Sequence, residues 1–128
     1  IPPKVVAPLS EFRGKWVLVT FDAPACDAYC ERKLYIMRQV RRAQGKDMDR
    51  IERLWVITDA GKPRTDAVVA SEGTRISSKE NLDFPGNAAD HIYVVDPLGN
   101  LMMRFPRDPD PSKVIKDLQR LLKVSRFG

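Results

Sequence analysis

A strand, a turn and a cysteine-containing helix follow one another near the start of this chain and restrict its fold most strongly. Residues 15–21 (KWVLVTF) are apolar, β-branched and aromatic, which predicts a buried strand. Pro24 interrupts that strand, and residues 27–44 carry apolar side chains at the spacing of an amphipathic helix. Residues 51–58 (IERLWVIT) predict a second strand, centred on 53–58. A strand, a helix and a further strand predict a parallel βαβ unit.

The last third of the chain predicts a hairpin and a helix. Residues 91–95 (HIYVV) and 101–105 (LMMRF) read as strands, and the turn between them, 96–100 (DPLGN), contains the proline and glycine that a tight turn requires. Asp110 is a suitable N-cap for a helix over 111–123, whose apolar side chains recur at helical spacing.

This order of elements predicts an α/β fold of the thioredoxin-like type, with a central mixed β-sheet flanked by helices. We expect 91–95 to pair antiparallel with 16–21, and 101–105 to pair antiparallel with 91–95. Residues 61–89 read mainly as loop, with one helical turn at 66–71. A chain of 128 residues fits one domain, so we expect 1–128 to be a single thioredoxin-like domain.

The formal net charge is +5, and much of the excess lies after the second cysteine. These side chains follow helical periodicity, so we interpret them as a solvated helix face, with an anionic membrane surface or an acidic protein as the alternative. They are Arg32, Lys33, Arg38, Arg41, Arg42 and Lys46. No nucleic-acid-binding motif is present, and the apolar runs are too short to cross a bilayer. The first residue is Ile1 and not Met, so we expect a removed segment before it, with a signal peptide, a membrane anchor and an arbitrary boundary of the sequence as the alternatives.

Cys26 and Cys30 are the two cysteines, spaced by one helical turn at the predicted start of a helix. The positive end of the helix dipole stabilises thiolate, the form that attacks disulfides and binds soft metals. An inert disulfide or two buried thiols remain the structural alternatives. Since one-turn spacing lets the sulfurs meet, we expect the pair to form a disulfide reversibly.

His91 is the one histidine of the chain, at the start of a predicted strand that a thioredoxin-like fold holds against the cysteine-bearing loop. A lone histidine is more often structural than ligating. Two thiolates and one imidazole would nevertheless suit copper, because sulfur favours Cu(I) and nitrogen helps to hold Cu(II).

These motifs together resemble the Sco/SenC family of thioredoxin-like copper proteins, which assist assembly of the copper centre of cytochrome oxidase. The resemblance lies in residues 14–18 (GKWVL), in 26–30 (CDAYC) and in Asp90-His91 followed by the IYVVDPLG segment. It implies that Cys26, Cys30 and His91 are copper ligands. The chain departs from the family at Glu31, where a proline is usual, and between Asp59 and His91, where it is shorter than the family's additional helix and strand.

The resemblance implies a copper-binding assembly factor that delivers copper to a cytochrome oxidase subunit or another copper protein, or reduces that subunit's cysteines. It implies a periplasmic location, tethered to the bacterial inner membrane by a segment upstream of the chain. The alternative is a thiol–disulfide oxidoreductase without metal, in which Cys26 is the more exposed, attacking thiolate, Cys30 resolves the mixed disulfide and His91 is dispensable. A third possibility is a degenerate interaction module with the cysteines locked as a disulfide.

Overall fold

The structure, a computed structural model, describes residues 11–78 and 84–124. Its strands are β1 (Trp16–Asp22), β2 (Ile51–Ile57), β3 (Arg75–Ser78), β4 (Tyr93–Val95) and β5 (Leu101–Arg104). Its helices are α2 (Ala28–Arg42), α3 (Thr65–Ala70) and α4 (Pro111–Val124), with short 3-10 segments η1 (Gly45–Arg50) and η2 (Ala88–Asp90).

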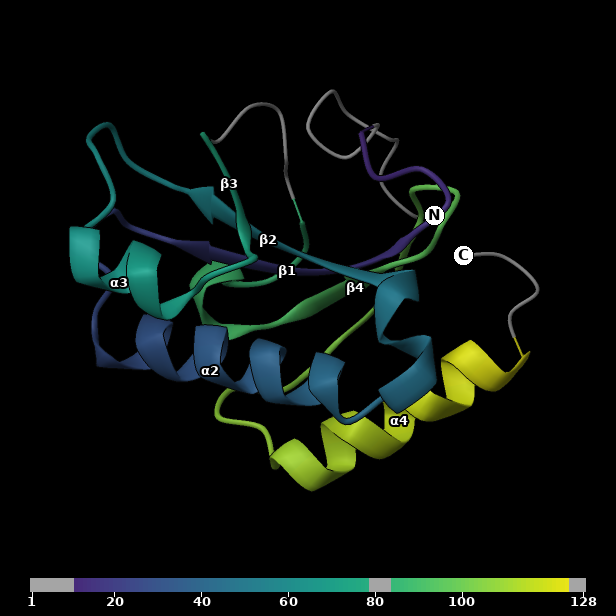
Figure 1. Cartoon of the computed structure of the whole chain (residues 1–128). Coiled ribbons are helices and arrows are strands. Elements are labelled where there is room, and N and C mark those ends of the chain that lie inside the picture. The colour runs from purple at the N-terminus through teal and green to yellow at the C-terminus, as the bar shows by residue number, and fades with distance from the viewer. Residues whose placement is uncertain (1–10, 79–83, 125–128) are drawn as a thin grey trace.

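The described strands form one mixed sheet in the order β3-β2-β1-β4-β5 (Figure 1). β1 is parallel to β2, with Trp16 opposite Ile51, and β2 is parallel to β3. β4 is antiparallel to both β1 and β5. The predicted thioredoxin-like fold, the βαβ unit and the antiparallel pairing of the hairpin with β1 are therefore confirmed.

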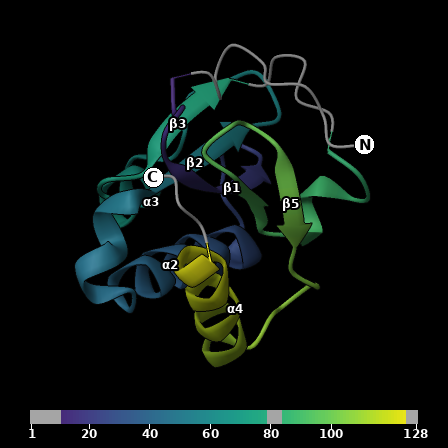
Figure 2. The ribbon, with the colours of Figure 1, turned by 90° about the vertical axis from the view of Figure 1, so that its right-hand side faces the viewer.

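Helices α2 and α4 cover the same face of the sheet (Figure 2). The apolar stripe of α4, formed by Val114, Leu118 and Leu122, packs with α2 and the strands in one buried cluster. On the opposite face, Phe21 and Tyr93 contact Phe84 edge to face, with ring centroids 5.3 and 5.1 Å from that of Phe84. Both faces of the sheet are thus buried, which fixes the ends of the strands in space.

The stretch 61–89 contains more regular structure than the sequence predicted. The helical turn expected at 66–71 is α3, and β3 adds a parallel edge strand beside β2, with Ile76 opposite Trp55. The interpretation of this stretch as mainly loop is wrong for its described part, because it did not include β3; residues 79–83 lie outside the described residues. β3 was not predicted because it is short and mostly polar. Of its described side chains, Ile76 alone packs against an apolar cluster.

The strand that was expected to begin at His91 begins two residues later, at Tyr93. His91 instead follows η2, in extended backbone. Within 11–78 and 84–124, no helix combines the length and the apolar character needed to cross a membrane.

Candidate redox and metal site

The turn after β1 positions the first cysteine directly before α2. The Cys26 backbone N–H donates to the carbonyl of Ala23 at 3.0 Å, and Cys26 adopts a left-handed backbone conformation with φ of 49°. Asp27 is the N-cap of α2, because its carboxylate accepts the Cys30 backbone N–H at 2.8 Å. Cys30 therefore lies in the first turn of the helix, as predicted.

Cys26 and Cys30 form a disulfide with their Cα atoms 5.0 Å apart. Both residues are fully buried, in a cluster with Leu34, Trp55, Ile57 and Ala67. The expectation that Cys26 is the more exposed cysteine is wrong. The left-handed turn directs Cys26 into the cluster, and the 61–64 segment lies against the loop, with the Arg64 N–H donating to the Pro24 carbonyl at 2.9 Å.

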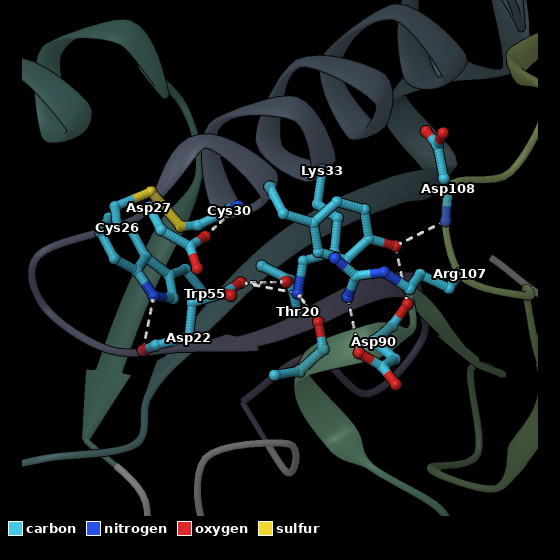
Figure 3. Close-up of polar contacts among 12 residues, drawn as sticks. Thr20, Asp22, Cys26, Asp27, Cys30, Lys33, Trp55, Asp90, Arg107 and Asp108 are labelled. Atoms are coloured by element: carbon cyan, nitrogen blue, oxygen red, sulfur yellow. Dashed lines mark hydrogen bonds and ion pairs between the residues drawn. A yellow bond between two sulfur atoms is a disulfide. The ribbon is translucent and has the colours of Figure 1, made fainter.

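A buried ion pair lies next to the disulfide cluster (Figure 3). The Lys33 ammonium is 2.9 Å from a carboxylate oxygen of Asp22, with the side chains 0% and 7% exposed. The Thr20 hydroxyl donates to the same carboxylate at 2.6 Å, and Lys33 also donates to the carbonyl of Ala89 at 2.5 Å. The Trp55 indole N–H donates to the Asp22 carbonyl at 3.2 Å, so one hydrogen bond connects the ion pair to the disulfide cluster.

Burial opposes the charge on both members of this pair. It raises the pKa of Asp22 above its ordinary value, while the neighbouring Lys33 charge and the Thr20 hydrogen bond oppose that rise. Burial likewise lowers the pKa of Lys33, while Asp22 opposes the fall. Each charge is therefore stabilised mainly by the other, because both groups are almost entirely removed from solvent.

The interpretation of the basic run as a solvated helix face is wrong at Lys33. That side chain lies on the buried face of α2 with Cys30, Leu34 and Met37. The spacing of four residues of α2 places them on one helical face, namely Cys30, Lys33, Leu34 and Met37. This spacing was the sequence feature from which the burial of Lys33 could have been predicted. Asp22, at the end of a buried strand, is the partner that sequence analysis also missed.

A second polar network joins the first turn of α2 to the segment before His91 (Figure 3). The Tyr29 hydroxyl donates to the carbonyl of Asp90 at 2.7 Å and accepts the Asp108 backbone N–H at 2.8 Å. The Arg107 guanidinium lies 4.2 Å from the centre of the Tyr29 ring and pairs with the Asp90 carboxylate at 2.7 Å. Tyr29, the residue before Cys30, is therefore hydrogen-bonded directly to Asp90, the residue before His91.

The His91 side chain itself is engaged elsewhere. Its Nδ1 lies 2.6 Å from the carbonyl of Phe105, an arrangement in which Nδ1–H donates, and its ring meets Tyr93 edge to face. Across 11–78 and 84–124, no group of three or more histidine, cysteine, aspartate or glutamate side chains is arranged to hold a metal ion. In this disulfide state the structure brings Cys26 and Cys30 together and leaves the His91 ring outside their cluster.

The arrangement is suited to thiol chemistry. Reduction would leave two thiols at the positive end of α2, where the helix dipole favours thiolate. The Asp27 carboxylate at the N-cap opposes that effect, and the buried Lys33 lies on the same helical face as Cys30. The reduced pair could therefore exchange with another disulfide or bind a soft metal ion.

Solved structures with a similar fold include copper-bound and redox proteins. Copper-bound ScoI of Bradyrhizobium japonicum aligns with a TM-score of 0.65 and 21% identity, over 87% of this chain and 87% of that chain. Copper-bound yeast Sco1 aligns with a TM-score of 0.68 and 14% identity, over 91% and 83%. The thioredoxin domain of a Bacteroides vulgatus thiol-disulfide oxidoreductase aligns with a TM-score of 0.59 and 21% identity, over 88% and 83%.

The predicted resemblance to the Sco/SenC family is confirmed at the level of the fold by these alignments. No curated protein matches the sequence. The model of one family, described as the transmembrane-like, thioredoxin-like, C-terminal domain, matches residues 16–125. The chain, with its disulfide at the start of α2, belongs to that thioredoxin-like family.

Proposed function

We propose that the chain is an assembly factor that reduces a disulfide of a partner protein through Cys26 and Cys30. The observation that carries this proposal is the Cys26–Cys30 disulfide at the N-terminal end of α2. Its two oxidation states would be the disulfide and the reduced pair of thiols. The partner would be a cytochrome oxidase subunit or another copper protein, on the periplasmic side of an inner membrane to which this chain is tethered.

The proposed thiol–disulfide exchange takes place in two steps. The Cys26 thiolate attacks one sulfur of the partner disulfide, and the other partner sulfur leaves as a thiolate that takes up a proton. The Cys30 thiolate then attacks the Cys26 sulfur and releases the second partner thiol. This chain is oxidised by two electrons and the partner is reduced by two, so a dithiol reductant has to restore the starting state.

Cys26 is the better candidate for the attacking residue although both sulfurs are buried. It precedes the N-cap Asp27, whereas Cys30 lies within the first turn of α2. The Arg64–Pro24 hydrogen bond ties the turn before Cys26 to the 61–64 segment, and breaking it would free that turn without unwinding the helix, whereas exposing Cys30 would disturb the cap. We therefore expect a partner to open this contact before exchange.

Replacing Cys30 by serine should trap the mixed disulfide, because the resolving thiol is absent. The reduced C30S variant, mixed with a disulfide-bonded model peptide, should accumulate a covalent adduct at Cys26 that wild type resolves. Intact-mass spectrometry with peptide mapping measures the adduct. C26S is the matched control and should accumulate adduct at least tenfold more slowly. Equal rates for the two variants would contradict the assignment of Cys26 as attacking residue.

Copper binding is the second candidate function of the same centre, with copper as cargo. It is favoured by the Tyr29–Asp90 hydrogen bond, which holds the segment before His91 against the turn that carries Cys30. Proteins of similar fold, such as yeast Sco1, have been solved with copper bound. We propose that the reduced thiols take Cu(I) and that His91 leaves the Phe105 carbonyl to complete a Cu(II) site, from which copper passes to the partner.

A further inference from the structure

A pocket of about 350 Å³ lies between the second half of α2, η1, β2 and the turn before β3. Four arginines contribute to its wall, together with Met48 and a single carboxylate, that of Glu72. The arginines are Arg38, Arg41, Arg42 and Arg53. The pocket is separate from the disulfide, because its helical residues begin two turns after Cys30.

Arg53 is the unusual member of this group. It is the third residue of β2 and is only 6% exposed, in a strand whose other side chains are mostly apolar. Its Nη2 donates to the carbonyl of Glu72 at 2.9 Å. Its Nε and Nη1 are buried and have no hydrogen-bond partner in the part of the chain that the structure describes. A buried charge whose donors lack acceptors is costly, so Arg53 would be stabilised by an anion bound close to it in the pocket.

Neighbouring arginines add to the positive charge around Arg53. Burial lowers the pKa of Arg53, and the charges of Arg41, Arg38 and Arg42 lower it further. Arg41 is partly satisfied, since its Nε donates to the Ile51 carbonyl at 2.7 Å and its Nη2 lies 3.7 Å from Asp49. For Arg38 and Arg42, no ion pair is found with any described residue. The pocket thus concentrates positive charge that the nearby carboxylates of Glu72, Asp49 and Glu52 offset only in part.

We propose that this pocket binds a phosphate-type oxyanion, with Arg53 as a buried positive charge at its base and Arg38 and Arg42 donating from its rim. A phosphoryl group has several acceptor oxygens, and guanidinium groups match such oxygens in charge and geometry. A volume of about 350 Å³ is enough for a phosphoryl group with a small substituent. The phosphoryl group could belong to a free phosphate compound or to a phospholipid headgroup, and both sources present the same chemistry to the arginines.

Gly73 supports the packing that holds Arg53 in place. A Cβ atom at Gly73 would lie 2.5 Å from Arg53 Nη2, and Gly73 has a φ of 87° that favours glycine. The turn before β3 therefore closes over this guanidinium, with the Glu72 carbonyl as its acceptor. The guanidinium is thereby held as a fixed positive charge at the base of the pocket.

Calorimetric titration of the full chain with inorganic pyrophosphate at fixed ionic strength tests the proposal. Wild type should bind, and Arg53→Met should weaken binding about tenfold or more, because it removes the buried positive charge at the base of the pocket. The rim variant R38A/R42A should also lose affinity and keeps the test valid if R53M fails to fold. R32A, which removes one positive charge from the other end of the same helix, should bind like wild type.

Flotation with phosphatidylglycerol vesicles, compared with phosphatidylcholine vesicles, distinguishes the two sources. Flotation that requires both the anionic lipid and Arg53 would identify a headgroup, whereas pyrophosphate binding without flotation would identify a free phosphate compound. Absence of binding to both probes would overturn the proposal. So would equal loss of affinity in R32A and the two pocket variants, because binding would then follow net charge alone.

Discussion

Replacing Lys33 by methionine should lower the free energy of unfolding by about 3–5 kcal/mol, the usual cost of removing one partner of a buried ion pair. The Asp22 carboxylate would keep its Thr20 hydrogen bond but lose the charge 2.9 Å away, in surroundings where Asp22 is 6% exposed. The Ala89 carbonyl would also lose its donor. Urea unfolding followed by circular dichroism measures the change.

Arg32 provides the matched control for this prediction. It is the preceding residue of α2 and pairs with Asp108, but its side chain is 48% exposed. R32M should therefore change the free energy of unfolding by no more than about 1 kcal/mol. The double variant D22N/K33M should recover part of the loss in K33M, because it removes the unpaired charge. Equal destabilisation in K33M and R32M would show that the Asp22–Lys33 pair does not stabilise the fold as described.

Replacing either cysteine by serine should abolish Cu(I) binding by the reduced protein, the second large effect that we expect. Two thiolates supply most of the affinity for this soft ion, and a serine hydroxyl is a poor substitute. His91→Ala should weaken Cu(I) binding modestly and Cu(II) binding strongly, because the imidazole suits the oxidised ion. H91A also removes the hydrogen bond that the Phe105 carbonyl accepts from the imidazole ring in wild type.

Anaerobic titration of fully reduced protein, followed by charge-transfer absorption and copper quantification, measures these affinities. Wild type should bind one copper ion per chain. Unchanged Cu(II) affinity in H91A would remove His91 from the proposed ligand set and leave metal-free exchange as the better account. Absence of Cu(I) binding by wild type would eliminate the copper proposal altogether, while the exchange proposal would stand on its own test.

Much of the fold could be predicted because local sequence and tertiary packing agree. The predicted strand over 16–21 and the helix over 27–44 correspond to β1 and α2, and the DPLGN turn leads into β5. Glycine and proline at the turn and aspartates at the caps mark those boundaries directly. That residues 1–128 make a single domain stays a prediction, because the chain ends lie outside the described residues.

The parts of the site that the sequence did not predict depend on contacts between distant residues. The Asp22–Lys33 pair joins a strand end to a helix face, and helical spacing places Lys33 on the apolar face of α2 without indicating its partner Asp22. The burial of Cys26 involves residues of α2, β2 and α3, and the packing of Arg53 involves the turn at Gly73. The sequence spacing predicted that the cysteines lie at the start of a helix, but it did not predict which residues bury them.

The most direct test of the central claim is equilibration of the folded protein across a series of glutathione redox buffers, with alkylation and mass spectrometry counting free thiols. A reversible dithiol centre predicts zero thiols at the oxidising end, two at the reducing end and the same midpoint from both directions, with far-ultraviolet circular dichroism preserved. A disulfide that opens only when the protein unfolds, or two thiols that persist under strong oxidant, would contradict the assignment of Cys26 and Cys30 as a redox centre.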